Sequence, residues 1–168
     1  MDETPLRKEL PRDYVSRISE DKNNFIQAER ACFVITADTI VSLGTRIMGK
    51  PKDVTEAETF LRRMSGRRHK VITGVCIGHN GKTYKRLVET RLKMKVLSEF
   101  EISAFLKSNE WKGRAGGYGL QGSASYFFPF ISGSYTNAVG LPVTELVSLL
   151  IGLGYQLPKT FMMGDVLN

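Results

Sequence analysis

The stretch from His69 to Val96 constrains the fold more than any other part of the chain, because it carries two strand patterns joined by a turn. His69–Gly78 is rich in β-branched residues, and Asn80-Gly81 is a strong signal for a two-residue hairpin turn. From Tyr84 to Val96 apolar residues alternate with charged ones, which is typical of a strand with one buried and one solvated face. The pattern therefore predicts a hairpin within an antiparallel sheet.

Helix and strand patterns also alternate along the rest of the chain. Apolar residues at helical spacing predict a helix over about Asp13–Ala31, and a β-branched run predicts a buried strand over Phe33–Val41. Capping boxes at Asp53–Glu56 and Ser98–Glu101 predict helices over Val54–Met64 and from Ser98 to about Ser108. Further along, the sequence predicts an aromatic strand over Ser125–Ile131, a turn over Gly133–Asn137 and a last helix over Pro142–Leu153.

The length of 168 residues fits one domain with a core of its own. We expect residues 1–157 to form a single α/β domain and residues 158–168 to be a frayed tail. No run approaches the roughly 20 apolar residues of a membrane helix, and the acidic start is not a secretory signal. Cys32 and Cys76 have no metal-ligand spacing and suit a reducing, cytoplasmic setting.

The formal charge of +7 permits two classes of partner. Nucleic acid is one, because basic surfaces release counterions from phosphates. The other is a small polyphosphate such as a nucleotide, bound where a few cations converge. The basic residues are spread over many segments, and the densest cluster, Arg62–Lys70, is equally well explained by cations at a helix end. Charge alone does not choose between the two classes.

Two charged residues stand in apolar surroundings. Lys22 interrupts the apolar stripe of the first helix, and its side chain either snorkels to the edge or points into a cleft; the pattern alone favours snorkelling. Asp38 closes the β-branched run of the predicted strand, and a carboxylate at the end of a buried strand is costly unless it is paired, capped or bound to a metal. Ligands collect beside the carboxyl ends of strands in open α/β sheets, so Asp38 is a candidate if other groups converge on it.

The segment Glu110–Gly122 holds five of the 16 glycines and the single tryptophan. Glycines allow backbone amides to approach a ligand closely, and successive amides can form an anion-binding nest. A flexible surface loop is the alternative. Because the segment also carries Arg114, Tyr118 and Gln121, a functional loop is favoured.

Taken together, these motifs resemble those of the Maf family, also called septum-formation inhibitor proteins, which are nucleoside triphosphate pyrophosphatases. The matching pieces occur in family order: Asp2-Glu3-Thr4, Tyr14–Lys22, Ala37-Asp38-Thr39, Gly49-Lys50-Pro51, Met64–Gly66 with His69–Gly74, Gly113–Gly122 and Gly133–Pro142. The resemblance implies an α/β fold with a mixed, twisted sheet flanked by helices, and two lobes around a central cleft. It also implies a homodimer and a divalent cation, Mg²⁺ or Mn²⁺.

Carried over position by position, the resemblance implies roles for individual residues. Asp38 would be the general base and a metal ligand, with Lys22 and Lys50 balancing phosphate charge and Gln121 as a polar cleft contact. Either Asp2 or Glu3 would be the acidic residue that helps hold the metal. The substrate-binding residues that it implies are Thr39, Thr73, Arg114 and Gly117.

Ala37-Asp38-Thr39 and Val71–Gly74 resemble the branch of the family that hydrolyses dTTP and UTP, whereas the 7-methyl-GTP branch typically has Ser-Asp-Gln at the first place. Family members begin with a strand and a Ser-x-Ser-Pro-Arg-Arg phosphate loop that this sequence lacks. Three explanations are open: a misassigned start codon, which is favoured, a fragment, or a true loss of the loop. Without the first strand, we expect strand edges of the sheet to be uncovered.

Two rival functions follow from the same observations. The absence of the arginine-rich loop suggests a pseudo-enzyme that binds nucleotide or a partner in division control without turnover. The charge and the aromatic residues suggest a nucleic-acid-binding module. The second is disfavoured because no recognised nucleic-acid-binding pattern occurs, and the aromatic run Tyr126–Phe130 is expected to be core.

Overall fold

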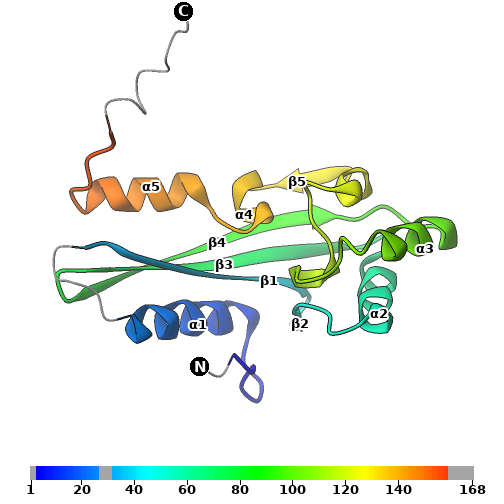
Figure 1. The fold of residues 1–168 in the computed structure, drawn as a ribbon, viewed down its shortest axis with the longest axis horizontal. Coiled ribbons are helices and arrows are strands. Elements are labelled where there is room, and N and C mark those ends of the chain that lie inside the picture. Colours follow the sequence, from blue (N-terminus) through cyan, green and yellow to red (C-terminus); the bar gives the residue numbers. More distant parts are fainter. Residues whose placement is uncertain (1–2, 27–31, 159–168) are drawn as a thin grey trace, which may run out of the picture.

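A five-stranded sheet organises the part of the chain that the computed structural model describes, residues 3–26 and 32–158 (Figure 1). The strands, in the order β2-β1-β3-β4-β5, are β1 (Val34–Leu43), β2 (Arg46–Met48), β3 (Arg68–His79), β4 (Lys82–Lys93) and β5 (Phe130–Ser132). Every pair is antiparallel. The α/β class with flanking helices is confirmed, but the parallel pairs of a mixed sheet do not occur among these strands.

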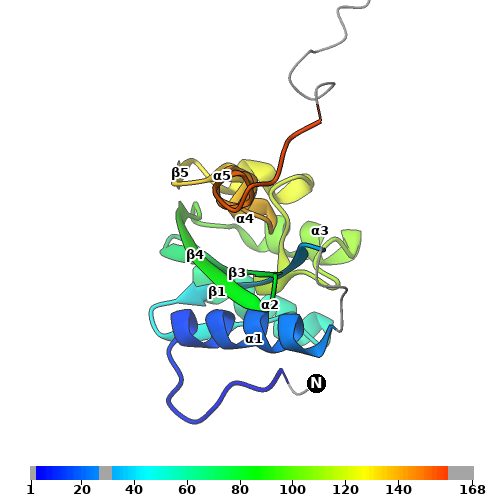
Figure 2. The ribbon, with the colours of Figure 1, turned by 90° about the vertical axis from the view of Figure 1, so that its left-hand side faces the viewer.

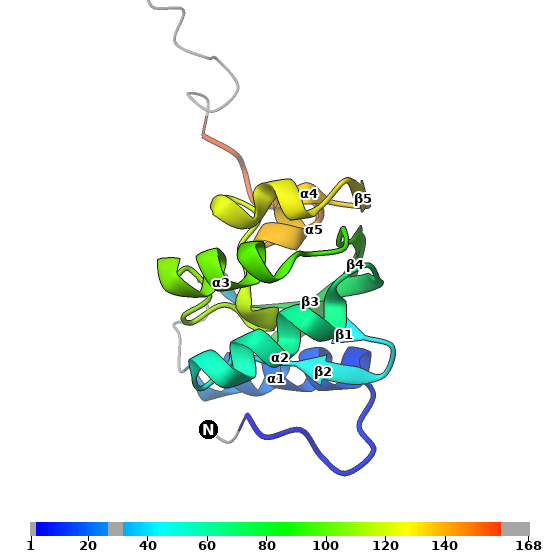
Figure 3. The ribbon, with the colours of Figure 1, turned by 90° about the vertical axis from the view of Figure 1, so that its right-hand side faces the viewer.

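Helices cover both faces of the sheet and one of its ends. They are α1 (Pro11–Phe25), α2 (Val54–Met64), α3 (Glu99–Ser108), α4 (Tyr135–Val139) and α5 (Val143–Gly152), with 3₁₀ turns η1 (Ala115–Gly117) and η2 (Ser123–Phe127). Figure 2 shows α1 below the sheet and α5 above it, and Figure 3 shows α2 and α3 at the end of the sheet.

The hydrophobic core is divided among these helices. Tyr14, Val15 and Ile18 of α1 pack against the sheet, and Leu146 and Leu150 of α5 pack on strand β3. A third and larger cluster joins α2, α3, η2 and the glycine-rich segment to one end of the sheet. The larger of the two cavities described below lies between two of these clusters. Tyr14 and Ile40 of the α1 cluster and Met48 of the third cluster all line it.

The local signals that predicted the elements are present in the structure. The Asp53 carboxylate accepts a hydrogen bond from the Glu56 amide at 2.8 Å, and Ser98 forms a full capping box with Glu101. α2 spans Val54–Met64, as predicted. Asn80 and Gly81 both have positive φ, which a tight turn compatible with strand twist requires.

Three elements differ from their predictions. The first helix begins at Pro11, where proline suits the first turn, and ends at Phe25 rather than near Ala31. The aromatic segment after Gly122 forms the η2 turn and only the short strand β5, because Pro129 cannot donate to a ladder. Residues 135–139 form helix α4, capped by Ser134, rather than a turn.

The aromatic run is partly in the core, since Phe127 and Phe128 are buried but Tyr126 and Phe130 are exposed. Strand β1 pairs with β2 only through Val41–Leu43, so among the described residues its Val34–Ile40 edge has no strand partner on the side away from β3. Apart from Pro158, the predicted tail lies outside the described residues.

Candidate active site

Asp38 lies in the middle of β1, not at the end of a strand as the sequence analysis expected, and is paired in register with Gly74 of the central strand β3. Its side chain faces α1 and is only 12% exposed. The helix comes this close because β3 has glycine where the two elements cross. A Cβ at Gly74 would lie 2.4 Å from the Val15 carbonyl oxygen, and one at Gly78 would lie 2.5 Å from Asn23 Oδ1.

Lys22 reaches from the last turn of α1 to this carboxylate. Its Nζ donates to Asp38 Oδ1 at 2.7 Å and lies 3.0 Å from Glu3 Oε1. The interpretation that Lys22 snorkels to the helix edge is therefore wrong: the ammonium is held between two carboxylates. The sequence pattern could not decide this, because both partners are distant from the apolar stripe along the chain.

Tyr14 places Glu3 beside Lys22. The Tyr14 hydroxyl donates to the Glu3 backbone carbonyl at 2.8 Å, and Arg17 binds both the Glu9 carboxylate and the Thr4 carbonyl. These contacts fasten the segment before α1 along the helix. No sequence signal singled out Tyr14 for this task, since its position predicts only an apolar contact.

The electrostatics of the pair follow from burial and mutual attraction. Burial raises the pKa of Asp38 above the ordinary value, and the attraction of Lys22 and Lys50 only partly offsets the loss of hydration. Burial opposes the charge on Lys22, but hydrogen bonds to Asp38 and Glu3 outweigh it, and the pKa of the ammonium is raised. The site thus holds a carboxylate that is easier to protonate than usual next to a firmly charged lysine.

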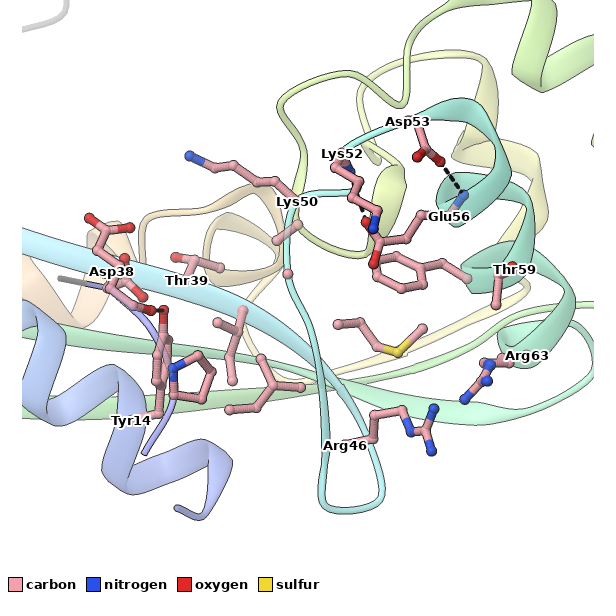
Figure 4. Close-up of a pocket in the computed structure, with 18 of the residues that line it drawn as sticks. Tyr14, Asp38, Thr39, Arg46, Lys50, Lys52, Asp53, Glu56, Thr59 and Arg63 are labelled. Atoms are coloured by element: carbon pink, nitrogen blue, oxygen red, sulfur yellow. Dashed lines mark hydrogen bonds between the residues drawn. The ribbon is translucent and has the colours of Figure 1, made fainter. Parts of the chain in front are cut away.

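Lys50 belongs to the loop between β2 and α2, whose geometry is fixed by Pro51, which is buried, and by the Gly49 carbonyl, which accepts from the Gly116 amide at 2.9 Å. Figure 4 shows the Lys50 side chain extending from this loop toward the strand that carries Asp38 and Thr39. Within the described ranges its ammonium has no salt-bridge partner. Lys50 is therefore available to an anion in the cleft.

Two cavities meet at Asp38, Thr39, Lys50 and Ala115. The larger, of about 890 Å³, runs from Glu3 past β2 to the face of α2, and its lining is drawn in Figure 4. The smaller, of about 340 Å³, lies between β1, the glycine-rich segment and the turn before α5. Four of the predicted functional residues line the smaller cavity together: Lys22, Asp38, Lys50 and Gln121.

The four predicted substrate-binding residues divide into two groups. Thr39 lines both cavities and Arg114 lines the smaller one. Thr73 is fully buried beneath Thr39, with the two hydroxyl oxygens 2.8 Å apart, and Thr39 also donates to the Gly140 carbonyl at 2.9 Å. Gly117 lines neither cavity.

Gly117 instead packs closely against the loop before α2 and against α2 itself. Its φ is +72°, and a Cβ there would lie 3.3 Å from Pro51 Cγ and 3.9 Å from Ala57 Cβ. Like Thr73, it supports a cavity wall from behind. Gly74 and Gly140, which the sequence analysis did not single out as site residues, shape the site directly. A glycine inside a strand was the available signal for Gly74.

The two carboxylates beside Lys22 are suitable ligands for the divalent cation, Mg²⁺ or Mn²⁺, that the resemblance implies. Glu3 and Asp38 converge on one cationic group, and Mg²⁺ is commonly held by one or two carboxylates together with substrate phosphates. Among residues 3–26 and 32–158 there is no cluster of three or more His, Cys, Asp or Glu that would hold a metal without such help. Asp2, the alternative ligand, lies outside the described residues.

No helix of residues 3–26 and 32–158 has both the length and the apolar character needed to cross a membrane. Comparison with known proteins gives consistent matches over most of the chain. The dTTP/UTP pyrophosphatase of Roseobacter denitrificans is 46% identical over 156 residues, covering 93% of this chain and 83% of that protein. The proteins of the same name from Cereibacter sphaeroides and Hyphomonas neptunium are 48% and 50% identical over 157 residues, covering 94% and 93% of this chain and 82% of each relative.

The match to a protein family covers the described site as well. The family described as Maf-like protein matches residues 1–153, a span that includes Glu3, Lys22, Asp38, Lys50 and Gln121. The ordered motifs, the cleft between two lobes and the similarity to these relatives agree, and the chain belongs to the Maf family.

Proposed function

We propose that the chain is a nucleoside triphosphate pyrophosphatase that hydrolyses dTTP and UTP to the monophosphate and pyrophosphate. The observation that carries the proposal is the convergence of Lys22, Asp38, Lys50 and Gln121, from four separate segments, on one cavity. The names of the relatives, which act on dTTP and UTP, support the choice of substrate.

Asp38 acts as the general base. A water oxygen attacks the α-phosphorus, its proton passes to the Asp38 carboxylate, and the bond from the α-phosphorus to the bridging oxygen breaks, so that pyrophosphate leaves with the electron pair. A base works best when its pKa approaches the working pH, and burial moves the pKa of Asp38 in that direction. The partner ammonium of Lys22 orients the carboxylate at 2.7 Å.

Lys22, Lys50 and Arg114 neutralise charge on the phosphoryl oxygens. All three line the smaller cavity, and charge stabilisation is the main task in phosphoryl transfer because little covalent chemistry is left to the protein. Glu3 and Asp38 would hold the divalent cation, Mg²⁺ or Mn²⁺, which when bound polarises the phosphoryl group.

The smaller cavity takes the pyrimidine nucleoside. Its walls combine apolar side chains, Val41 and Val71, with the polar Thr39 and Gln121, a composition that suits a flat base with hydrogen-bonding edges. Thr73 and Gly117 contribute to substrate binding through the walls that they support. We also propose that the protein is a homodimer that acts in the cytoplasm.

The test is pyrophosphate release from a panel of dTTP, UTP, CTP, GTP and 7-methyl-GTP, with Mg²⁺ and with Mn²⁺, on this chain and on a version extended at its N-terminus with the family's Ser/Arg phosphate loop. The proposal expects dTTP and UTP to be hydrolysed best. Preference for 7-methyl-GTP would overturn the assignment of the branch. Nucleotide binding without turnover by both proteins would favour the pseudo-enzyme, and salt-sensitive binding of oligonucleotides alone would favour the nucleic-acid module.

A further inference from the structure

A buried histidine at the start of β3, His69, has no task in the reaction described so far. Its side chain is 3% exposed, and its ring forms T-shaped contacts with the rings of Tyr118 and Phe128. Its Nε2 lies 2.7 Å from the Tyr118 hydroxyl. A buried imidazole is costly unless it is hydrogen-bonded, whereas an apolar residue would fill the same space without needing a hydrogen-bond partner. The hydrogen bond to Tyr118 is therefore the feature to explain.

Tyr118 belongs to the glycine-rich segment, four residues after Arg114 and three before Gln121, and it lines the smaller cavity with both. The segment consists of one 3₁₀ turn and irregular backbone with positive φ at Gly113, Gly116 and Gly117. Such a backbone has many alternative conformations in the absence of side-chain anchors. The positions of Arg114 and Gln121 depend on whatever restrains it.

The hydrogen bonds from this segment to the rest of the fold are few, although Tyr118 and Leu120 are also buried in the hydrophobic cluster with α2 and α3. The Gly116 amide binds the Gly49 carbonyl, and the Glu110 carboxylate accepts from the Ser123 amide beyond the other end. Between these two points, in the part of the chain that the structure describes, the bond from Tyr118 to His69 is the hydrogen bond that joins residues 118–122 to the sheet.

Burial keeps both partners of this hydrogen bond neutral. Desolvation lowers the pKa of His69 to about 4 and raises the pKa of Tyr118, so near pH 7 the imidazole is neutral and the phenol is protonated. The pair is uncharged, and its geometry persists across the neutral pH range.

We propose that His69 and Tyr118 are positioning residues, whose hydrogen bond holds the glycine-rich segment against β3 so that Arg114 and Gln121 face the cleft beside Asp38. The inference rests on the proposed function for its kinetic consequence. The restraint itself is a property of the free protein and can be measured without substrate.

Tyr118→Phe removes the hydroxyl and keeps the ring in the core. The matched control is Tyr126→Phe, because Tyr126 is a neighbouring tyrosine that is 58% exposed and lines neither cavity of the site. In Tyr118→Phe we expect kcat/KM for dTTP to fall about tenfold, mainly through KM, at a temperature where thermal melting shows the variant to be folded. The control is expected to keep wild-type constants.

Two further readouts separate positioning from a purely structural role. Gln121→Ala should reduce kcat/KM by a smaller factor in the Tyr118→Phe background than in the wild type, because the displaced Gln121 has already lost part of its effect. His69→Leu should reproduce Tyr118→Phe, and His69→Gln, whose amide can donate or accept this hydrogen bond, should be the milder of the two. Independent effects of Tyr118 and Gln121, or a lower melting temperature with unchanged kcat and KM, would overturn the proposal.

Hydrogen–deuterium exchange tests the restraint independently of turnover. Amides of residues 118–122 should exchange about tenfold faster in Tyr118→Phe than in the wild type, with exchange in α2 and β4 unchanged. Unchanged exchange in residues 118–122 would overturn the inference even if activity fell. A wild-type protein that hydrolyses no triphosphate would contradict the proposed function, and the exchange measurement would still decide the role of the pair.

Discussion

Replacing Asp38 by Asn should lower kcat without lowering the free energy of unfolding. The variant keeps an oxygen acceptor for Lys22 at nearly the same place, and Lys22 retains Glu3 at 3.0 Å, so the local geometry survives. The amide cannot accept the proton of water. We expect kcat to fall by about 10²–10⁴, which corresponds to about 2.7–5.4 kcal/mol of lost transition-state stabilisation.

The stability change follows from the sign of the pKa shift. Because the pKa of Asp38 is raised in the folded protein, the folded state binds the proton more tightly than the unfolded state. Ionisation of Asp38 therefore lowers the free energy of unfolding as pH rises from the ordinary range of an aspartate through the raised pKa. Above that window the charged carboxylate is a net burden on the fold, and Asp38→Asn should be at least as stable as the wild type.

The assay combines pyrophosphate release from dTTP with calorimetric melting at pH 7.5. The matched control is Asp21→Asn, one residue before Lys22 on the same helix, where the carboxylate is exposed and pairs with Arg17 at 3.6 Å. The control should retain activity. Asp38→Asn activity within tenfold of the wild type, or a fall of more than about 5 °C in melting temperature, would refute the reasoning.

Three further outcomes follow from the same structure. Gly116→Ala should lower the free energy of unfolding by about 2–4 kcal/mol, because φ is +70° and the new Cβ would lie 2.7 Å from Val41 Cγ2. Gly44→Ala is the control, with a positive φ but open space around the new Cβ, and should have a smaller effect. Equal midpoints of urea unfolding for the two variants would contradict this prediction. Since the folded-state pKa of His69 is about 4, below the ordinary value, the wild type should lose about 3 kcal/mol of stability as pH falls from 6.5 to 4, and His69→Gln should lose less in the same titration. Lys22→Met should reduce kcat/KM about 100-fold and lower the melting temperature, because the carboxylates of Glu3 and Asp38 then face each other without a cation. Activity within threefold of the wild type in the pyrophosphate-release assay would argue against a role for Lys22 in catalysis.

The sequence predicted best where a structure is decided by neighbours along the chain. The bounds of α2 and the start of α3 follow from caps that act over three residues, and the β3–β4 hairpin follows from Asn80-Gly81. The aromatic segment after Gly122 was wrong as a long strand, because its pairing depends on how much of β4 is available and on Pro129.

In the candidate site, too, the sequence indicated features that depend on neighbouring residues and missed those that depend on contacts between distant segments. That Lys22 and Asp38 are unusual could be read from their apolar surroundings, but that each is the other's partner depends on the packing of α1 across Gly74. The resemblance named Thr73 and Gly117 without showing that they lie behind the cavity walls. The contribution of Tyr14, which fixes Glu3 through a backbone carbonyl, leaves no pattern in the sequence.

Hydrolysis in water enriched with ¹⁸O tests most directly where the cleft around Asp38 directs attack. If the water is activated beside the α-phosphorus, mass spectrometry should find one ¹⁸O atom in the dTMP produced from dTTP and none in the pyrophosphate after a single turnover. Label in pyrophosphate or in free phosphate, with dTMP unlabelled, would contradict the account.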